Sequence, residues 1–128
     1  MNLNVSFKSK GDDAYIVYPV GALNSDTSQK LEQVLNEVIA LEPKLVVLDL
    51  DQLGYISSAG IRVFLKAKKD LKRTEAKLSF MNLQPPVRKV FDIINALPSM
   101  DIFASLAELD EYLDAMQQMV ERDETQKL

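Results

Sequence analysis

Apolar residues recur along the chain at two different spacings, and the changes between them mark the expected strands and helices. Residues 3–7 alternate between apolar and polar side chains, and residues 14–20 form a dense apolar, β-branched and aromatic run, so both segments are predicted to be strands. The Gly-Asp-Asp run at 11–13 forms a turn between them. The two strands are therefore expected to pair as a hairpin, and Pro19 indicates an irregular or edge position near the end of the second strand.

The middle of the chain has the pattern of a helix, a buried strand and a second helix. The first helix is expected to begin after the capping residues 24–27 and to end before Pro43. Residues 45–48 are continuously apolar, which predicts a strand buried on both faces in the centre of a sheet. The second helix is predicted over residues 58–73. Its inward-facing residues are expected to be Ile61, Phe64, Leu65 and Leu71, with Val63 and Ala67 widening the apolar stripe.

The last third of the chain continues the alternation of strands and helices. Residues 77–83 predict a strand, prolines at 85–86 open a third helix, and residues 102–103 form a short fifth strand at best. Residues 105–108 form a capping box that begins a last helix. The apolar face of that helix is predicted to contain Leu106, Leu109, Leu113, Met116 and Val120.

The element order β-β-α-β-α-β-α-(β)-α predicts a single α/β domain. Strands that alternate with helices from residue 14 onward favour a mixed, mostly parallel sheet of four to five strands with about four helices and right-handed crossovers. The domain is expected to cover residues 1–120, and residues 121–128 form a polar C-terminal tail.

The composition removes most enzymatic chemistry. The 128 residues contain no cysteine and no histidine, which excludes disulfides, thiolate or imidazole zinc sites, and catalytic triads or dyads built on these side chains. The four glycines form no standard phosphate-binding loop. Asp49 and Asp51 could hold a divalent metal, but polar residues ending a buried strand are the favoured interpretation. We therefore predict a protein that is not an enzyme, with no metal site, no cofactor and no small-molecule substrate.

The charge balance is acidic, with 15 Lys and Arg residues against 19 Asp and Glu residues and a net charge of -4. This balance disfavours binding to nucleic acid or to an anionic membrane. The basic cluster at 66–73 lacks interleaved aromatic residues, so a solvated helix face is favoured over a nucleic-acid site. No signal-peptide core and no apolar run of about 18 residues is present, so a cytoplasmic location without membrane insertion is expected.

Two adjacent serines are the strongest candidates for a functional site. Ser57 and Ser58 lie between the buried strand and the second helix, where an exposed loop is expected. A hydrolase nucleophile elbow would need glycine in place of Ile56, and no histidine is present to activate a serine hydroxyl. A helix N-cap explains one serine but not two hydroxyls followed by Ala59 and Gly60. We interpret the small residues as keeping the surface open for another protein.

The segment Tyr-Ile-Ser-Ser-Ala-Gly-Ile-Arg-Val-Phe-Leu at 55–65 resembles the signature of the STAS domain family, in its anti-sigma-factor antagonist branch. Gly-Ala-Leu-Asn at 21–24 is similar to the family's Gly-x-Leu-Asp loop, and residues 45–50 are similar to its Val/Leu-rich strand ending in Asp. Residues 82–90 match the Asn-Leu-x-Pro-x-Val segment that opens the third helix. The resemblance covers about residues 3–118 and implies a STAS-like fold, a small sheet packed with about four helices.

The resemblance implies a role in partner switching. The unphosphorylated antagonist binds an anti-sigma factor, usually a serine kinase related to histidine-kinase ATPases, and a metal-dependent serine/threonine phosphatase reverses the phosphorylation that ends the interaction. The position that matches the phosphorylated serine is Ser58, with Ser57 as the second choice. Ser57 and Asn24 each stand where the family often has aspartate. The partner-binding residues implied by the resemblance are Asn24, Ser25, Ser57, Ser58, Ala59, Gly60 and Arg62.

The position of Ser58 at the expected start of the second helix indicates how such a switch works. A phosphate at the start of a helix meets unpaired N–H groups and the positive end of the helix dipole, and Arg62 at i+4 from Ser58 could pair with it. Two alternatives remain open at this point. One is a STAS subunit that docks constitutively to a transporter or another assembly, and the other is a small enzyme or nucleotide-binding domain, which the missing histidines and glycine loops disfavour.

Overall fold

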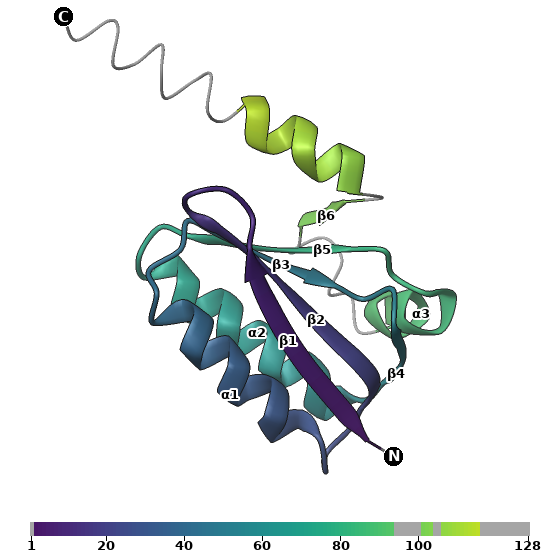
Figure 1. The fold of residues 1–128 in the computed structure, drawn as a ribbon. Helices are drawn as coiled ribbons and strands as arrows, with labels where there is room; N and C mark the ends of the chain where they lie inside the picture. Colours follow the sequence, from purple (N-terminus) through teal and green to yellow (C-terminus); the bar gives the residue numbers. More distant parts are fainter. Residues whose placement is uncertain (1, 94–100, 104–105, 116–128) are drawn as a thin grey trace, which may run out of the picture.

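The computed structural model describes residues 2–93, 101–103 and 106–115 (Figure 1). The elements follow in this order: β1 (Leu3–Ser9), β2 (Ala14–Leu23), α1 (Ser28–Ile39), β3 (Leu45–Asp49), β4 (Leu53–Ile56), α2 (Ser58–Lys72), β5 (Lys77–Met81), α3 (Pro85–Ile93), β6 (Asp101–Phe103) and a last helix over residues 106–115. None of the described helices is long and apolar enough to cross a membrane.

The strands form one mixed, mostly parallel sheet in the order β1-β2-β3-β5-β6, with β4 pairing with the far end of β2. β1 is antiparallel to β2, which confirms the predicted hairpin, and every other pairing is parallel. β3 lies between β2 and β5, and its residues Leu45, Val46, Val47 and Leu48 are all buried. The α/β fold class and the central place of β3 are therefore as predicted.

The structure adds one strand to the predicted four or five. β4 was expected to be only the exit from β3, because its four residues include Gly54 and two exposed side chains and so lack a clear alternation. Its pairing becomes possible because β2 extends to Leu23, three residues beyond the predicted end at 20. Gly21 allows this extension: it has a φ of 123°, and a Cβ at this position would lie 2.2 Å from the Asn2 carbonyl oxygen.

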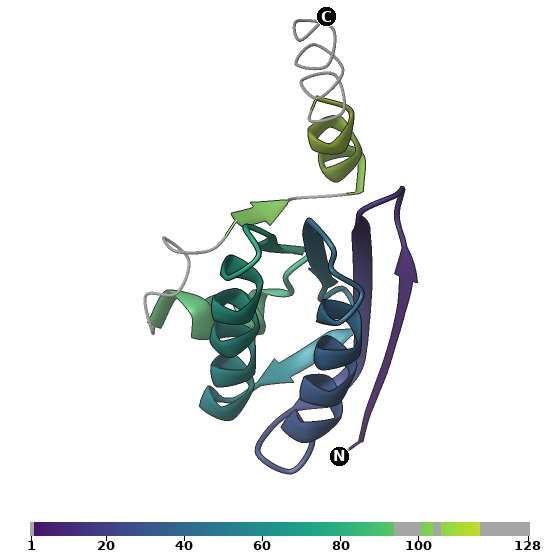
Figure 2. The same cartoon turned by 90° about the vertical axis from the view of Figure 1, so that its left-hand side faces the viewer.

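Helices α1 and α2 run side by side along one face of the sheet (Figures 1 and 2). The main core lies between these helices and the sheet, and α3 closes it through Val87 and Phe91. Phe64, Phe80 and Phe91 meet edge to face at its centre, with ring centroids 5.0 Å, 6.1 Å and 5.4 Å apart. This geometry suits aromatic rings, whose positive edges favour negative faces.

One residue of α2 does not face the core as predicted. Leu65 was expected to point inward, but 44% of it is exposed. The buried arc of the helix is centred on Gly60, Phe64, Ala67 and Leu71, and it ends at Ile61. Because each residue advances by about 100° around a helix, Leu65 falls just beyond that arc.

The opposite face of the sheet carries a second, smaller core. Leu109 of the last helix is fully buried there against Ile16, Val47 and Met81. An ion pair of 3.0 Å joins Asp110 of this helix to Lys10 in the β1–β2 turn (Figure 1). The predicted apolar positions Met116 and Val120, and the boundary of the tail at residue 121, lie outside the described residues.

Candidate functional site

The predicted site residues come from the loop after β2 and from the start of α2, and these two segments lie next to each other. β2 and β4 pair in parallel with Leu23 opposite Ile56, so both strands end at the same place on the sheet. The Ser57 N–H donates to the Leu23 carbonyl oxygen at 2.9 Å. The structure therefore brings the loop with Asn24 and Ser25 beside Ser57 and Ser58, although α1, β3 and β4 lie between the two segments in the sequence.

Asn24 organises the first of these loops. Its side-chain oxygen accepts hydrogen bonds from the N–H groups of Asp26 at 2.9 Å and Thr27 at 3.1 Å. The buried Thr27 hydroxyl accepts from the Asn24 N–H at 2.9 Å and donates to the Ala22 carbonyl oxygen at 2.8 Å. These bonds need an acceptor oxygen but no negative charge, so asparagine builds the loop where aspartate would also fit. Ser25 and Asp26 stay exposed at its tip.

Thr27 was expected only as one of the capping residues, and the role of its buried hydroxyl within this loop was not predicted. It is 4% exposed and is one of two buried polar residues among those described. The available signal was the Asn-x-x-Thr spacing immediately before a helix, which is typical of local side-chain to backbone bonding.

Ser57 begins α2 through its backbone and not through its hydroxyl. It has the extended conformation of an N-cap residue, with φ −105° and ψ 174°, and its carbonyl oxygen accepts from the N–H groups of Gly60 at 3.0 Å and Ile61 at 3.2 Å. The side chain makes no capping bond, and its Oγ is buried without a hydrogen-bond partner among the described residues. The serine hydroxyl that was expected to cap the helix therefore does not do so in this conformation.

Ser58 is the first residue of α2 and is exposed. The first N–H groups of an α-helix have no partner within the helix and carry the positive end of its dipole. The first turn of α2 contains no acidic residue that would balance this charge. The helix start is therefore electrostatically suited to a negative group at position 58.

The two small residues that follow have different surroundings. Ala59 is half-buried, whereas Gly60 is buried. A Cβ at Gly60 would lie 2.6 Å from the Cγ and Cδ2 atoms of Leu23 and 3.0 Å from the Cγ1 atom of Ile56. The absent side chain at position 60 thus lets α2 approach β2 and β4, which replaces the interpretation that this glycine keeps the surface open for a partner.

We expect Gly60→Ala to lower the free energy of unfolding by about 1–2 kcal/mol. The added methyl group overpacks the contact with Leu23, which typically costs about 1–3 kcal/mol, and the gain in helix propensity offsets up to about 1 kcal/mol of this. Gly54→Ala is the matched control, because a Cβ there has only the Gln84 side chain, at 3.8 Å, within reach. Urea unfolding measures the stability of the two variants. Equal unfolding midpoints for Gly60→Ala and Gly54→Ala would contradict the packing role of Gly60.

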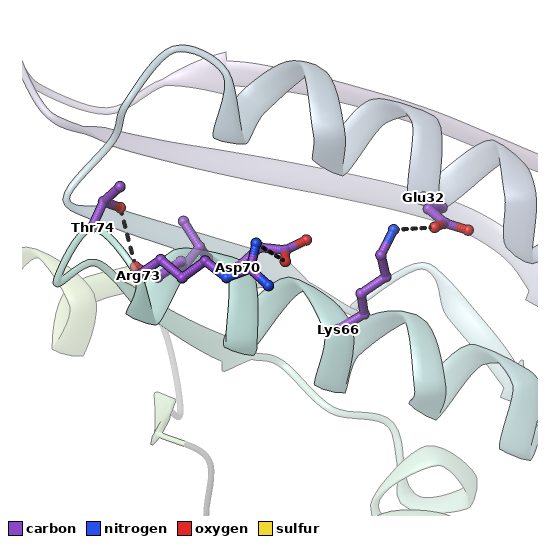
Figure 3. Close-up of polar contacts among 6 residues, drawn as sticks. Glu32, Lys66, Asp70, Arg73 and Thr74 are labelled. Carbon is purple, nitrogen blue, oxygen red and sulfur yellow. Dashed lines mark hydrogen bonds and ion pairs between the residues drawn. The ribbon is translucent and has the colours of Figure 1, made fainter.

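Arg62 lies one helical turn after Ser58 and is exposed, and it forms no ion pair with another described residue. The next cation along α2 is paired: Lys66 reaches Glu32 of α1 with 2.5 Å between Nζ and Oε1 (Figure 3). The hydrogen bond and the charge of Glu32 raise the pKa of the Lys66 ammonium above its usual range. The guanidinium of Arg62 is therefore the cation available closest in sequence to Ser58.

Asp49 is the last residue of β3, and its side chain connects the end of β3 to the residue that follows β5. The Asp49 Oδ1 atom accepts from the Asp51 N–H at 3.1 Å and from the Asn82 side-chain amide at 3.2 Å. No group of three acidic residues that could hold a metal ion is found within the described part of the chain. These bonds agree with the interpretation that the two aspartates end a buried strand.

Comparisons with known proteins identify relatives over most of the chain. The family model for the STAS domain matches residues 7–109. A protein of Bordetella bronchiseptica named as an anti-sigma factor antagonist, BtrV, is 40% identical over 84 residues, which are 66% of this chain and 72% of that protein.

Solved structures have the same fold. The crystal structure of an anti-sigma factor antagonist from Mycobacterium paratuberculosis superposes with a TM-score of 0.77 at 19% identity, covering 91% of this chain and 95% of the other. The phosphorylated form of the Bacillus cell fate determinant SpoIIAA gives a TM-score of 0.67 at 15% identity, covering 85% and 99%. With its strand order, its two adjacent loops and its matched residues 7–109, the chain belongs to the STAS domain family.

Proposed function

We propose that this protein is an anti-sigma-factor antagonist controlled by phosphorylation of Ser58. In the unmodified state it binds an anti-sigma serine kinase of the cytoplasm and so frees a sigma factor for transcription. Phosphorylation of Ser58 by that kinase ends the complex, and a serine/threonine phosphatase restores the binding form. The observation that carries this proposal is the exposed Ser58 at the first position of α2, beside the loop of Asn24.

The names of the related proteins support the same role. BtrV of Bordetella bronchiseptica is named as an anti-sigma factor antagonist, and it matches this chain at 40% identity. The SpoIIAA protein of Bacillus, which has the same fold, has been solved in a phosphorylated form.

The surroundings of the two serines favour Ser58 as the phosphate acceptor. A kinase must reach the hydroxyl oxygen, which attacks the γ-phosphoryl group in line with the leaving oxygen. Ser58 is exposed at the helix start, whereas the Ser57 Oγ is covered by protein. Phosphorylation at Ser57 would require its segment to open first, and that segment carries the N–H bond to Leu23.

A phosphate at Ser58 is expected to change the surface and to preserve the fold. It adds about −1.5 to −2 charges at neutral pH, and it lies at the positive end of a helix dipole that no acidic residue of the first turn neutralises. Arg62, at i+4, is placed to contact it. A partner that docks over Ser58 would have to bury this dianion, and an unmatched buried charge is strongly unfavourable.

Mapping the phosphate tests the proposal. The protein is incubated with ATP and, one at a time, the anti-sigma serine kinases encoded in the same genome, and the modified residue is located by mass spectrometry. We expect one kinase to modify Ser58, with Ser57→Ala still phosphorylated and Ser58→Ala not. Modification mainly at Ser57 would contradict the assignment. If no kinase modifies the chain, the favoured function becomes that of a STAS subunit that docks constitutively to a transporter or another assembly.

A further inference from the structure

The outer face of α2 carries a row of positive charges that starts one turn after Ser58. At about 100° per residue, five exposed cations fall outside the buried arc of Gly60, Phe64, Ala67 and Leu71, four of them on the far side of the helix and Lys72 at its edge beside Leu65. We call them the cationic stripe: Arg62, Lys66, Lys69, Lys72 and Arg73. One acidic residue, Asp70, lies at the flank of this face next to Lys66 and Arg73, and the exposed Leu65 is its one large apolar side chain.

Most of this charge is not balanced within the described part of the protein. Lys66 is paired with Glu32 of α1, and Arg73 lies 3.9 Å from Asp70, which is on the flank of the same helix (Figure 3). Arg62, Lys69 and Lys72 form no ion pair with another described residue. Three unpaired cations therefore remain on a single helix face of a chain whose net charge is -4.

The stability of the helix does not account for this arrangement. Like charges at i,i+3 and i,i+4 repel each other, and Lys69 has such neighbours in Lys66, Lys72 and Arg73. Cations in the last turn interact favourably with the helix dipole, which helps Lys69 and Lys72. Arg62 lies in the second turn of the helix, where the dipole gives a positive charge no such stabilisation. A ligand that brings negative charge to the whole face would remove these unfavourable interactions.

We infer that the cationic stripe binds an acidic surface on the same protein partner that docks at Ser58. The inference rests on the proposed function and adds the chemistry of the partner to it. Ser58 and the stripe share one face of α2, and a helix of 15 residues extends for roughly 22 Å, which is the scale of a protein interface. The exposed Leu65 lies within the stripe and provides an apolar contact for such an interface.

A protein partner fits this face better than nucleic acid or a membrane does. The stripe contains no aromatic side chain that could stack on a base, and the remainder of the chain is acidic and would repel a polyanion. A protein with a local acidic patch can contact the stripe without approaching the acidic remainder of the chain. Complementary charges of this kind mainly increase the rate of association, and salt weakens the increase.

The stripe also connects partner binding to phosphorylation. A phosphate on Ser58 draws Arg62 toward itself, so one cation of the stripe is no longer available to the partner. The modification then repels the acidic partner directly and weakens the stripe at its nearest end.

Stopped-flow association with the kinase that binds the unphosphorylated chain tests the inference. The variant Lys69→Glu/Lys72→Glu reverses two charges of the stripe about three and four turns away from Ser58. Lys8→Glu/Lys44→Glu makes the same change in net charge on β1 and before β3, away from α2. We expect the stripe variant to associate at least about tenfold more slowly at low salt and to lose most of its salt dependence, while the control stays within about twofold of the wild type.

Each other outcome has a defined meaning. Equal rates for the two variants would overturn the inference and leave the proposed function standing, provided that phosphorylation of Ser58 still blocks binding. Tighter binding of the wild type to duplex DNA or to phosphatidylserine vesicles than to the kinase, lost in the stripe variant, would overturn it in favour of a polyanion. If no anti-sigma kinase binds the unphosphorylated chain, the proposed function fails, and the inference fails with it.

Discussion

Replacing Leu48 by aspartate is expected to lower the free energy of unfolding by more than about 3 kcal/mol, because it buries an unpaired charge. Leu48 is fully buried in the central strand β3, opposite Val17 of β2 and Phe80 of β5. No cation can reach this position, since both neighbouring strands present apolar side chains there. Domains of this kind are stable by only about 5–15 kcal/mol, so the loss is a large part of the total.

Leu41→Asp is the matched control for this prediction. It makes the same substitution at a leucine that is 52% exposed just after α1, and it should change stability by about 0.5 kcal/mol or less. Chemical unfolding followed by circular dichroism measures both variants. A Leu48→Asp protein that unfolds at the wild-type midpoint would show that β3 is not the centre of the sheet.

Ser58→Asp is expected to weaken kinase binding at least about tenfold, which corresponds to about 1.4 kcal/mol. The aspartate places a negative charge at the exposed start of α2, where the docking surface is proposed to lie. The fold should tolerate this change, because a carboxylate is favourable near a helix N-terminus, and the melting temperature should stay within a few degrees of the wild type. Aspartate carries less charge than phosphate, so the full phosphate effect should be larger.

Two controls separate a change in docking from a change in folding. Ser58→Ala should bind the kinase as the wild type does. Adding ATP should no longer weaken this binding, because the variant has no hydroxyl at position 58 to phosphorylate. Ser6→Asp adds the same charge on the exposed strand β1 and should bind normally. Isothermal titration calorimetry measures the kinase affinity of all three variants, and thermal melting measures their stability. A Ser58→Asp protein that melts far below the wild type would mean that the serine is mainly structural.

The sequence pattern was sufficient for the parts of the fold that local periodicity controls. Leu45–Leu48 is continuously apolar because β3 is covered on both faces, and the hairpin follows from two strands on either side of a short turn. β4 could not be predicted in this way. Its four residues gain their pairing from Gly21 on a distant strand, whose conformation no pattern within residues 53–56 reveals.

The sequence proposed candidate residues for the site, but it could not predict the surroundings of each. The proximity of Asn24 to Ser57 follows only from the parallel pairing of Leu23 with Ile56. Gly60 looked like an opening for a partner, and the structure shows it packed against Leu23, because which neighbour approaches a glycine is a property of tertiary packing. Likewise, two adjacent serines are equivalent in sequence, and only the fold covers one hydroxyl and exposes the residue that follows it.

The affinity of one anti-sigma kinase for the two phosphorylation states of this chain tests the proposed switch most directly. The protein phosphorylated to completion at Ser58 and the unmodified protein are titrated into the same kinase under the same conditions, and the melting temperature of each form is recorded. We predict that phosphorylation weakens binding by at least about tenfold while the fold is retained. Equal dissociation constants for the two forms would contradict the proposed switch.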